Sequence, residues 1–230
     1  MRCGHKSVFV SNAAQYGGFF YILNSEHLFH TRCINLHNKA DVSGGSIYAN
    51  SLETIEITDS HFEGNYADKL GGVLSIKEII AFNSFTSLYL NNKANVGNAV
   101  FLINSCYNAT LFANKIINNT ATTSGVGEIQ TNSFSATYSY FAWNKVKIVA
   151  ALVVHNAEII YFKNSIFMNN IALKTPGVLY IELTKFTLIA RTLFLDNIVL
   201  QKKQKRFKGG IVKLKNVNSI QYMEVLFINN

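Results

Sequence analysis

The stretch His61–Ser75, HFEGNYADKLGGVLS, holds an aromatic residue, an asparagine three positions later, an alanine two positions further on, and then a glycine pair before an apolar run. The same order of residue types returns along the whole chain. The counterparts of Asn65 are Asn12, Asn38, Asn92, Asn119, Asn144, Asn170, Asn197 and Asn230. The steps between these asparagines are 26, 27, 27, 27, 25, 26, 27 and 33 residues. A repeat of this length that persists along a chain predicts a solenoid of stacked coils.

Three further columns keep the same phase as the asparagines. Position −5 is mostly serine, position +2 is alanine or valine, and glycines follow it. Position −3 is aromatic in most repeats, with Asn35 as the polar exception in the second. The residues at position −3 are Phe9, Asn35, Phe62, Tyr89, Ile116, Phe141, Phe167, Phe194 and Phe227.

Short stretches of alternating hydrophobicity follow the glycines, which is typical of strands with one buried face. Examples are residues 19–22 and 178–181, and a second set includes residues 54–58 and 158–162. The aromatic position belongs to a third strand. We therefore predict an all-β fold, a parallel β-helix of about eight coils with three short strands in each, forming one domain over residues 1–230. Eight steps of about 4.8 Å predict a rod roughly 38 Å long.

Each column has a physical role in such a stack. We expect the aromatic side chains to form a buried pile of offset rings, and the alanines to sit where the chain bends inward. The glycine pair allows positive φ at a corner. An asparagine can donate and accept hydrogen bonds along its column and tolerates a left-handed turn. The recurring order thus assigns one residue type to each corner or face of the coil.

Two other folds fit the sequence less well. An ordinary β-sandwich would require four columns to stay in phase by chance. A leucine-rich repeat also covers a period of 27 residues, and residues 52–60, LETIEITDS, fit the start of its motif. That repeat would need leucine at position −5, where this chain has serine, threonine or asparagine, and it lacks the leucine-rich convex segment.

The composition favours an ordered protein, with 49% apolar and 15% charged residues. The net charge of +8 is uneven, because residues 1–114 carry 7 Lys or Arg and 8 Asp or Glu, whereas residues 115–230 carry 14 and 5. No apolar run is long enough for a membrane span, and the N-terminus has no signal-peptide core. Cys3, Cys33 and Cys106 occupy different phases of the repeat and lack CxxC spacing, which argues against a disulfide framework and a structural zinc site.

The FxxN motif followed by a glycine pair and an aliphatic residue, as in Phe62-Asn65-Gly71-Gly72, resembles the repeat of chlamydial polymorphic outer membrane proteins. Related right-handed parallel β-helix repeats occur in surface proteins of other microbes and protists. The resemblance covers nearly the whole chain and implies a right-handed, pectin-lyase-like β-helix. It also implies an extracellular or surface location and an adhesive stalk. The chain departs from the family in lacking a signal peptide and a recognisable C-terminal membrane-barrel segment.

The first motif begins at Ser7 and the last stops at Asn230 in mid-coil, with no amphipathic cap helix at either end. Open ends of a solenoid expose strand edges and core. We therefore expect this chain to be a piece of a longer protein, which meets the membrane only through segments outside it. The leading hypothesis for its function is a non-catalytic stalk or adhesive module of a surface protein. Its expected partners are glycans or cell-surface proteins, with no specific nucleic acid.

The runner-up is a carbohydrate-active β-helix enzyme, which needs two carboxylates a few ångströms apart. An intracellular scaffold is a third hypothesis, left open because the ends of the parent protein are missing. Asp41 and Asp68 share a repeat phase and form the best pair, but turn residues facing solvent explain them more simply. We expect no catalytic residues and no cofactor. A groove on one sheet face, lined by at least two acids and a base, would favour the enzyme.

Two polar segments are candidate binding sites. His27 and His30 form an HxxH pattern with His37 beyond, but no third ligand is evident, so we interpret the segment as a polar loop without a metal. Residues 201–208, QKKQKRFK, are an insertion in the repeat. They could bind an anionic partner or form a solvated loop. The candidate residues there are Lys202, Lys203, Lys205, Arg206 and Lys208.

Overall fold

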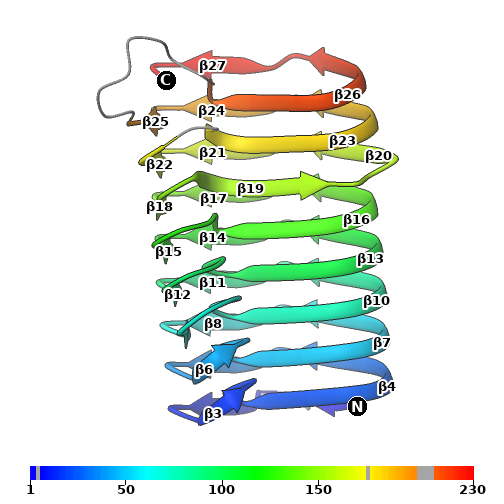
Figure 1. Cartoon of the computed structure of the whole chain (residues 1–230), viewed down its shortest axis with the longest axis vertical. Coiled ribbons are helices and arrows are strands. Elements are labelled where there is room, and N and C mark those ends of the chain that lie inside the picture. Colours follow the sequence, from blue (N-terminus) through cyan, green and yellow to red (C-terminus); the bar gives the residue numbers. More distant parts are fainter. Residues whose placement is uncertain (4–5, 175–176, 201–209) are drawn as a thin grey trace.

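The computed structural model describes residues 1–3, 6–174, 177–200 and 210–230 of the chain. Its strands stack coil upon coil along one long axis, from the N-terminal coil at one end to the C-terminal coil at the other (Figure 1). Every strand pairing in the described residues is parallel and joins neighbouring coils. The predicted all-β parallel solenoid is therefore confirmed, and neither a sandwich nor a leucine-rich repeat describes this arrangement.

The strands form three sheets, as predicted from three strands per coil. The long sheet contains the longest strand of most coils. Its strands are β1 (Arg2–Cys3), β4 (Phe20–Thr31), β7 (Ile47–Thr58), β10 (Leu74–Phe85), β13 (Phe101–Phe112), β16 (Gly127–Thr137), β19 (Val149–His155), β20 (Ile159–Lys163), β23 (Gly177–Ala190) and β26 (Val212–Met223).

The phenylalanine sheet carries the aromatic column. Its strands are β2 (Val8–Val10), β5 (Ile34–Leu36), β8 (His61–Glu63), β11 (Leu88–Leu90), β14 (Lys115–Ile117), β17 (Tyr140–Ala142), β21 (Ile166–Met168), β24 (Leu193–Leu195) and β27 (Leu226–Ile228).

The alanine sheet carries the small residues two positions after the ladder asparagines. Its strands are β3 (Ala13–Tyr16), β6 (Lys39–Ser43), β9 (Tyr66–Ala67), β12 (Lys93–Ala94), β15 (Thr120–Ala121), β18 (Lys145–Val146), β22 (Ile171–Ala172) and β25 (Ile198–Val199).

The division of each coil into strands differs from the prediction. The alternating stretch after the glycines and the second short stretch join into one strand, such as β7, which bends at Ser51 with φ of 58°. Only β19 and β20 remain separate in the described chain. A single residue in left-handed backbone turns the strand without ending its ladder, so a pattern of two strands and a turn also describes one bent strand.

The asparagine column is a continuous ladder that is buried from Asn38 to Asn197. The side-chain amide of Asn65 donates to Asn92 Oδ1 at 3.0 Å and to the carbonyl of Asn35 at 3.0 Å. Asn65 Oδ1 accepts from the backbone N–H of Asn38 at 3.0 Å and from its side-chain amide at 3.0 Å. Both donors and the acceptor of a fully buried amide are thus satisfied at the corner, as the sequence predicts.

The left-handed residue at this corner is not the ladder asparagine, contrary to the turn role expected for it. It is the residue before, as at His37 (φ 54°), Gly64 (φ 63°) and Asn91 (φ 57°). The ladder side chain must point inward to reach its neighbours, so the preceding residue makes the turn. The first glycine of each early pair does adopt positive φ, 70° at Gly44 and 61° at Gly71, as predicted.

The aromatic column forms the pile of rings that the sequence predicts. The Phe167 ring lies 4.8 Å from the rings of Phe141 and Phe194, with interplanar angles of 4° and 6°. Phe62 and Tyr89 stack in the same way at 5.2 Å. All five side chains are fully buried, so the pile adds ring contacts to a continuous apolar core.

Candidate functional site

An open hollow of about 250 Å³ lies on the outer face of the long sheet. The strands β16, β19 and β23 place its polar side chains in two neighbouring rows. Glu128, Val153 and Tyr180 share one row of the parallel register, and His155 and Glu182 lie two residues further along their strands. Since side chains alternate across a strand, residues two apart point to the same face. We call Glu128, His155, Tyr180 and Glu182 the acid–histidine cluster.

Glu128 is held from two sides. His155 Nε2 lies 3.5 Å from Glu128 Oε1, and the buried Asn98 donates to Glu128 Oε2 at 3.2 Å. Asn98 is itself fixed, because its Oδ1 accepts from the backbone N–H of Gly125 at 3.2 Å. The contact with His155 is the main cause that lowers the pKa of Glu128, against the opposing effect of burial. Glu128 is therefore a carboxylate at neutral pH.

Glu182 is also an ionised, partnered carboxylate. Tyr180 donates its hydroxyl hydrogen to Glu182 Oε2 at 2.8 Å, and Lys215 of β26 pairs with Glu182 Oε1. The ion pair with Lys215 is the main cause that lowers the pKa of Glu182. Burial and the neighbouring carboxylate together raise the pKa of Tyr180 to about 12, so this hydroxyl stays a donor.

A tyrosine platform lies on the same face toward the N-terminus. The rings of Tyr21 and Tyr48 stack at 5.4 Å with an interplanar angle of 11°, and Tyr16 lies 5.1 Å from Tyr48. The Tyr21 side chain is 56% exposed, so it presents a flat apolar surface with a polar edge to solvent. Tyr48 and Glu128 share one row, three coils apart, which is about 14 Å along the axis.

The arrangement suits binding better than hydrolysis. A glycosidase pairs a carboxylate with a protonated carboxyl whose pKa is raised. In the acid–histidine cluster both carboxyl pKa values are shifted downward. Two carboxylates, a tyrosine hydroxyl and an imidazole can instead accept and donate hydrogen bonds to the hydroxyl groups of a polar ligand.

The carboxylates singled out from the sequence lie elsewhere. Asp41 is exposed and pairs with Lys39 at 3.3 Å. Asp68 lies on the adjacent coil and contacts the Tyr66 hydroxyl and Asn95. Neither borders the hollow. The basic residues Lys202, Lys203, Lys205, Arg206 and Lys208 lie outside the described residues.

The acid–histidine cluster escaped the sequence reasoning because its members do not share one offset from the ladder asparagine. Glu128 follows Asn119 by nine residues, whereas Tyr180 follows Asn170 by ten. A register shift within β19, between Val149 and Leu152, absorbs this difference in spacing. The sequence offered one signal for these residues. The alternation of strand residues after the glycines indicates which side chains face outward.

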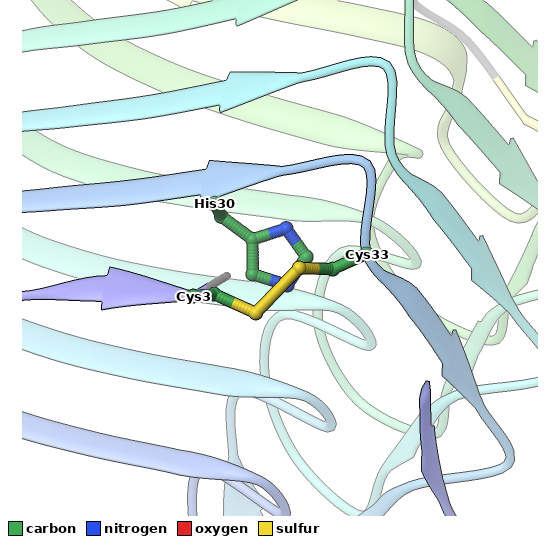
Figure 2. A group of neighbouring side chains, drawn as sticks. All are labelled: Cys3, His30 and Cys33. Carbon is green, nitrogen blue, oxygen red and sulfur yellow. A yellow bond between two sulfur atoms is a disulfide. The ribbon is translucent and has the colours of Figure 1, made fainter. Parts of the chain in front are cut away.

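A second cluster lies inside the N-terminal coil, where Cys3 and Cys33 form a disulfide beside His30 (Figure 2). The argument against a disulfide was therefore wrong. Cys33 occupies the serine column, and Cys3 pairs in register with His30 in the column beside it. Residues of different phases meet because two columns adjoin at one inner corner. The expected polar loop is also wrong, since His27 and His30 both lie in strand β4 and His30 is fully buried.

Over 119 residues, 50% of this chain, the sequence is 33% identical to a transmembrane domain-containing protein of Dictyostelium discoideum. The matched region is 7% of that protein's length. No family model and no solved structure matches the chain. The described residues contain no helix long and apolar enough to cross a membrane.

Proposed function

We propose that this chain is a non-catalytic stalk of a large, membrane-anchored surface protein, and that it presents the outer face of its long sheet to ligands. The observation that carries the proposal is the unbroken asparagine ladder, which ties each coil to the next from Asn12 to Asn230. A rod that is hydrogen-bonded along its length holds attached segments at a fixed distance. That property is of use to a protein that must reach away from a membrane.

The match to a Dictyostelium protein supports the proposal of a large, membrane-anchored parent protein. Its name describes a transmembrane domain, and the matched region is a small part of it. A solenoid segment within a long membrane-anchored chain has the architecture that a stalk requires. Membership of the FxxN repeat class of surface proteins, with a right-handed coil and an extracellular location, belongs to the same proposal.

The ligand we propose is a glycan lying along the rod axis. The stacked tyrosine platform offers flat apolar surface, and the acid–histidine cluster offers hydrogen-bond acceptors and donors on the same face. Glycans carry both kinds of surface, since their rings have apolar faces and hydroxyl edges.

The second candidate is a carbohydrate-active enzyme. The hollow is lined by two acids and a base, as we expect for the active site of such an enzyme. One experiment separates the two candidates. The purified chain is incubated with immobilised polysaccharides, and retention and release of soluble fragments are both measured. The stalk predicts retention without fragments. Fragment release that is lost in both Glu128→Gln and Glu182→Gln variants would favour the enzyme.

A further inference from the structure

The repeat breaks at three adjacent inner positions of one coil, beside the Cys3–Cys33 disulfide. Position −3 holds Asn35 where other coils have an aromatic or aliphatic residue, and position −5 holds Cys33 where the next coil has Ser60. The column of His30 continues with Ile57, Ser84 and Leu111. Buried polar groups also occur in these columns further along, where Ser84 contacts the Tyr89 hydroxyl and Asn114. The N-terminal coil differs because its substituted positions place an imidazole and a thiol sulfur beside the sulfur of Cys3.

The three side chains that could hold a metal ion are close together and shielded from water. The ligand atoms of Cys3, His30 and Cys33 all lie within 4.8 Å of one another. His30 and Cys33 are fully buried and Cys3 is 6% exposed. Figure 2 shows the imidazole beside the two sulfur atoms at the edge of the N-terminal coil. Two sulfurs and one imidazole are the protein ligands of known Cys₂His zinc sites.

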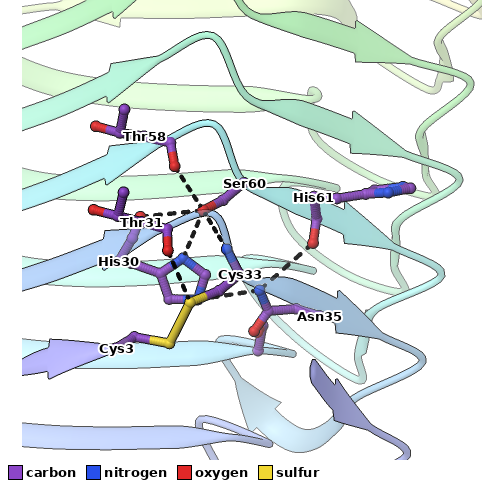
Figure 3. The surroundings of a disulfide bond; sticks show 9 residues. Cys3, His30, Thr31, Cys33, Asn35, Thr58, Ser60 and His61 are labelled. Carbon is purple, nitrogen blue, oxygen red and sulfur yellow. Dashed lines mark hydrogen bonds between the residues drawn. A yellow bond between two sulfur atoms is a disulfide. The ribbon is translucent and has the colours of Figure 1, made fainter. Parts of the chain in front are cut away.

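The surroundings fix the orientation and tautomer of His30 (Figure 3). The Asn35 amide N–H₂ lies 3.1 Å from His30 Nε2, so this nitrogen is an acceptor and Nδ1 carries the hydrogen. Nδ1 then donates to Ser60 Oγ at 3.1 Å, and Ser60 Oγ donates to the Thr58 carbonyl at 2.9 Å. A metal ion would replace the Asn35 N–H on the Nε2 lone pair, while the Nδ1–H would keep Ser60 as the second partner that metal-binding histidines usually have.

The backbone separation of the two cysteines is wide for a disulfide. The Cα atoms of Cys3 and Cys33 are 7.1 Å apart, beyond the usual disulfide range of about 4.4–6.8 Å. A zinc ion holds each sulfur at about 2.3 Å, so the two sulfurs of a zinc site stand further apart than those of a disulfide.

We propose that the reduced chain binds one zinc ion through Cys3, His30 and Cys33. The N-terminal coil is then cross-linked in one of two ways, by a disulfide when oxidised or by a thiolate–zinc site when reduced. Two molecules of a low-molecular-weight thiol reduce the disulfide, giving two cysteine thiols and one molecule of the oxidised small disulfide. Zinc then displaces the two thiol protons and takes the Nε2 lone pair of His30. Water or the side-chain oxygen of Asn35 completes a four-coordinate ion.

Cobalt(II) tests the site, because thiolate ligands give it intense near-ultraviolet charge-transfer bands and tetrahedral geometry gives strong visible bands. The full chain is reduced with a phosphine and titrated with Co²⁺ without oxygen, and Zn²⁺ is then added. We expect one equivalent of Co²⁺ with both bands, displacement by one equivalent of Zn²⁺, and no such bands for the oxidised chain.

The repeat itself supplies variants compatible with the fold. Cys33→Ser and His30→Ile introduce the residues that the next coil carries, and we expect each to weaken cobalt binding at least tenfold. Cys106→Thr, which introduces the residue in register at Thr131, is the control and should bind as the wild type does. The proposal is overturned if the reduced wild type gives no thiolate bands, or if Cys33→Ser binds equally well. Should the variants not fold, the comparison of reduced with oxidised wild type still decides.

Discussion

Asn92 Oδ1 accepts two hydrogen bonds from Asn65, one from the backbone N–H at 2.9 Å and one from the side-chain amide at 3.0 Å. Both residues are fully buried. A single side-chain oxygen thus satisfies two donors of the neighbouring coil, and the same unit repeats along the rod. The ladder is the structural element on which the proposed stalk depends.

Replacing one ladder member should therefore cost more than one ordinary hydrogen bond. Asn92→Ala leaves two buried donors of Asn65 and the carbonyl of Phe62 without their partner. We expect a loss of about 3–5 kcal/mol in the free energy of unfolding, since each orphaned buried group costs about 1–3 kcal/mol. Urea denaturation followed by circular dichroism measures this loss. Asn108→Ala, at an exposed position of β13, is the control and should change stability by less than about 0.5 kcal/mol.

The aromatic pile makes a separate, apolar contribution. Phe167→Ala removes a ring stacked on both sides and should destabilise by about 3–5 kcal/mol. Phe167→Ile should cost much less, because Ile116 fills the equivalent place in another coil and is fully buried there. Equal losses for the two variants in the same urea experiment would show that the site demands a ring and that the column is not a simple apolar filler.

The acid–histidine cluster predicts how stability depends on pH. The pKa of Glu128 is lowered in the folded chain, so its carboxylate stabilises the fold above the unfolded-state value of 4.5. This contribution is lost as the pH falls from 4.5 through the lowered folded-state pKa. Urea midpoints measured from neutral to acidic pH should fall less steeply for Glu128→Gln. A variant curve parallel to that of the wild type would mean that His155 does not stabilise the carboxylate.

The tyrosine platform predicts which residues determine glycan retention. Tyr48→Ala removes the ring that contacts both Tyr16 and Tyr21, and we expect at least a tenfold weaker affinity for any polysaccharide that the wild type retains. Tyr107→Ala removes another exposed tyrosine, away from the platform, and serves as the control. If the two variants lose affinity equally, the platform is not the binding surface.

The predicted anion-binding site at residues 201–208 stays a prediction. Neutralising its five cations to glutamine should lower retention on heparin and reduce the dependence of that retention on salt, if the segment binds anions. If the segment is only a solvated loop, the variant should elute from heparin at the same salt concentration as the wild type.

The sequence predicts structure best where the same residue type occupies the same position in every coil. The asparagine ladder, the aromatic pile and the parallel stacking follow from columns such as Phe62, Asn65 and Ala67. The sequence does not predict contacts between residues that occupy different positions of the repeat. The spacing of Cys3 and Cys33 does not reveal their contact, because a corner brings different phases together. Nor does the alternation after the glycines distinguish two strands from one strand bent at Ser51.

The outer face of the long sheet is not constrained by the repeat, and so its chemistry was not predicted. Inward positions must match their neighbours above and below, whereas outward positions such as Glu128 and Glu182 vary from coil to coil. A ligand-binding surface on a solenoid uses these free positions, so its residues do not form sequence columns.

The central claim, that this rod is displayed outside the cell by a membrane-anchored parent protein, is tested most directly by accessibility on living cells. An antibody raised against residues 1–230 would be applied to intact and to permeabilised cells that make the protein, with and without brief external protease treatment. The account predicts labelling of intact cells that protease removes. Labelling that requires permeabilisation and survives external protease would contradict it.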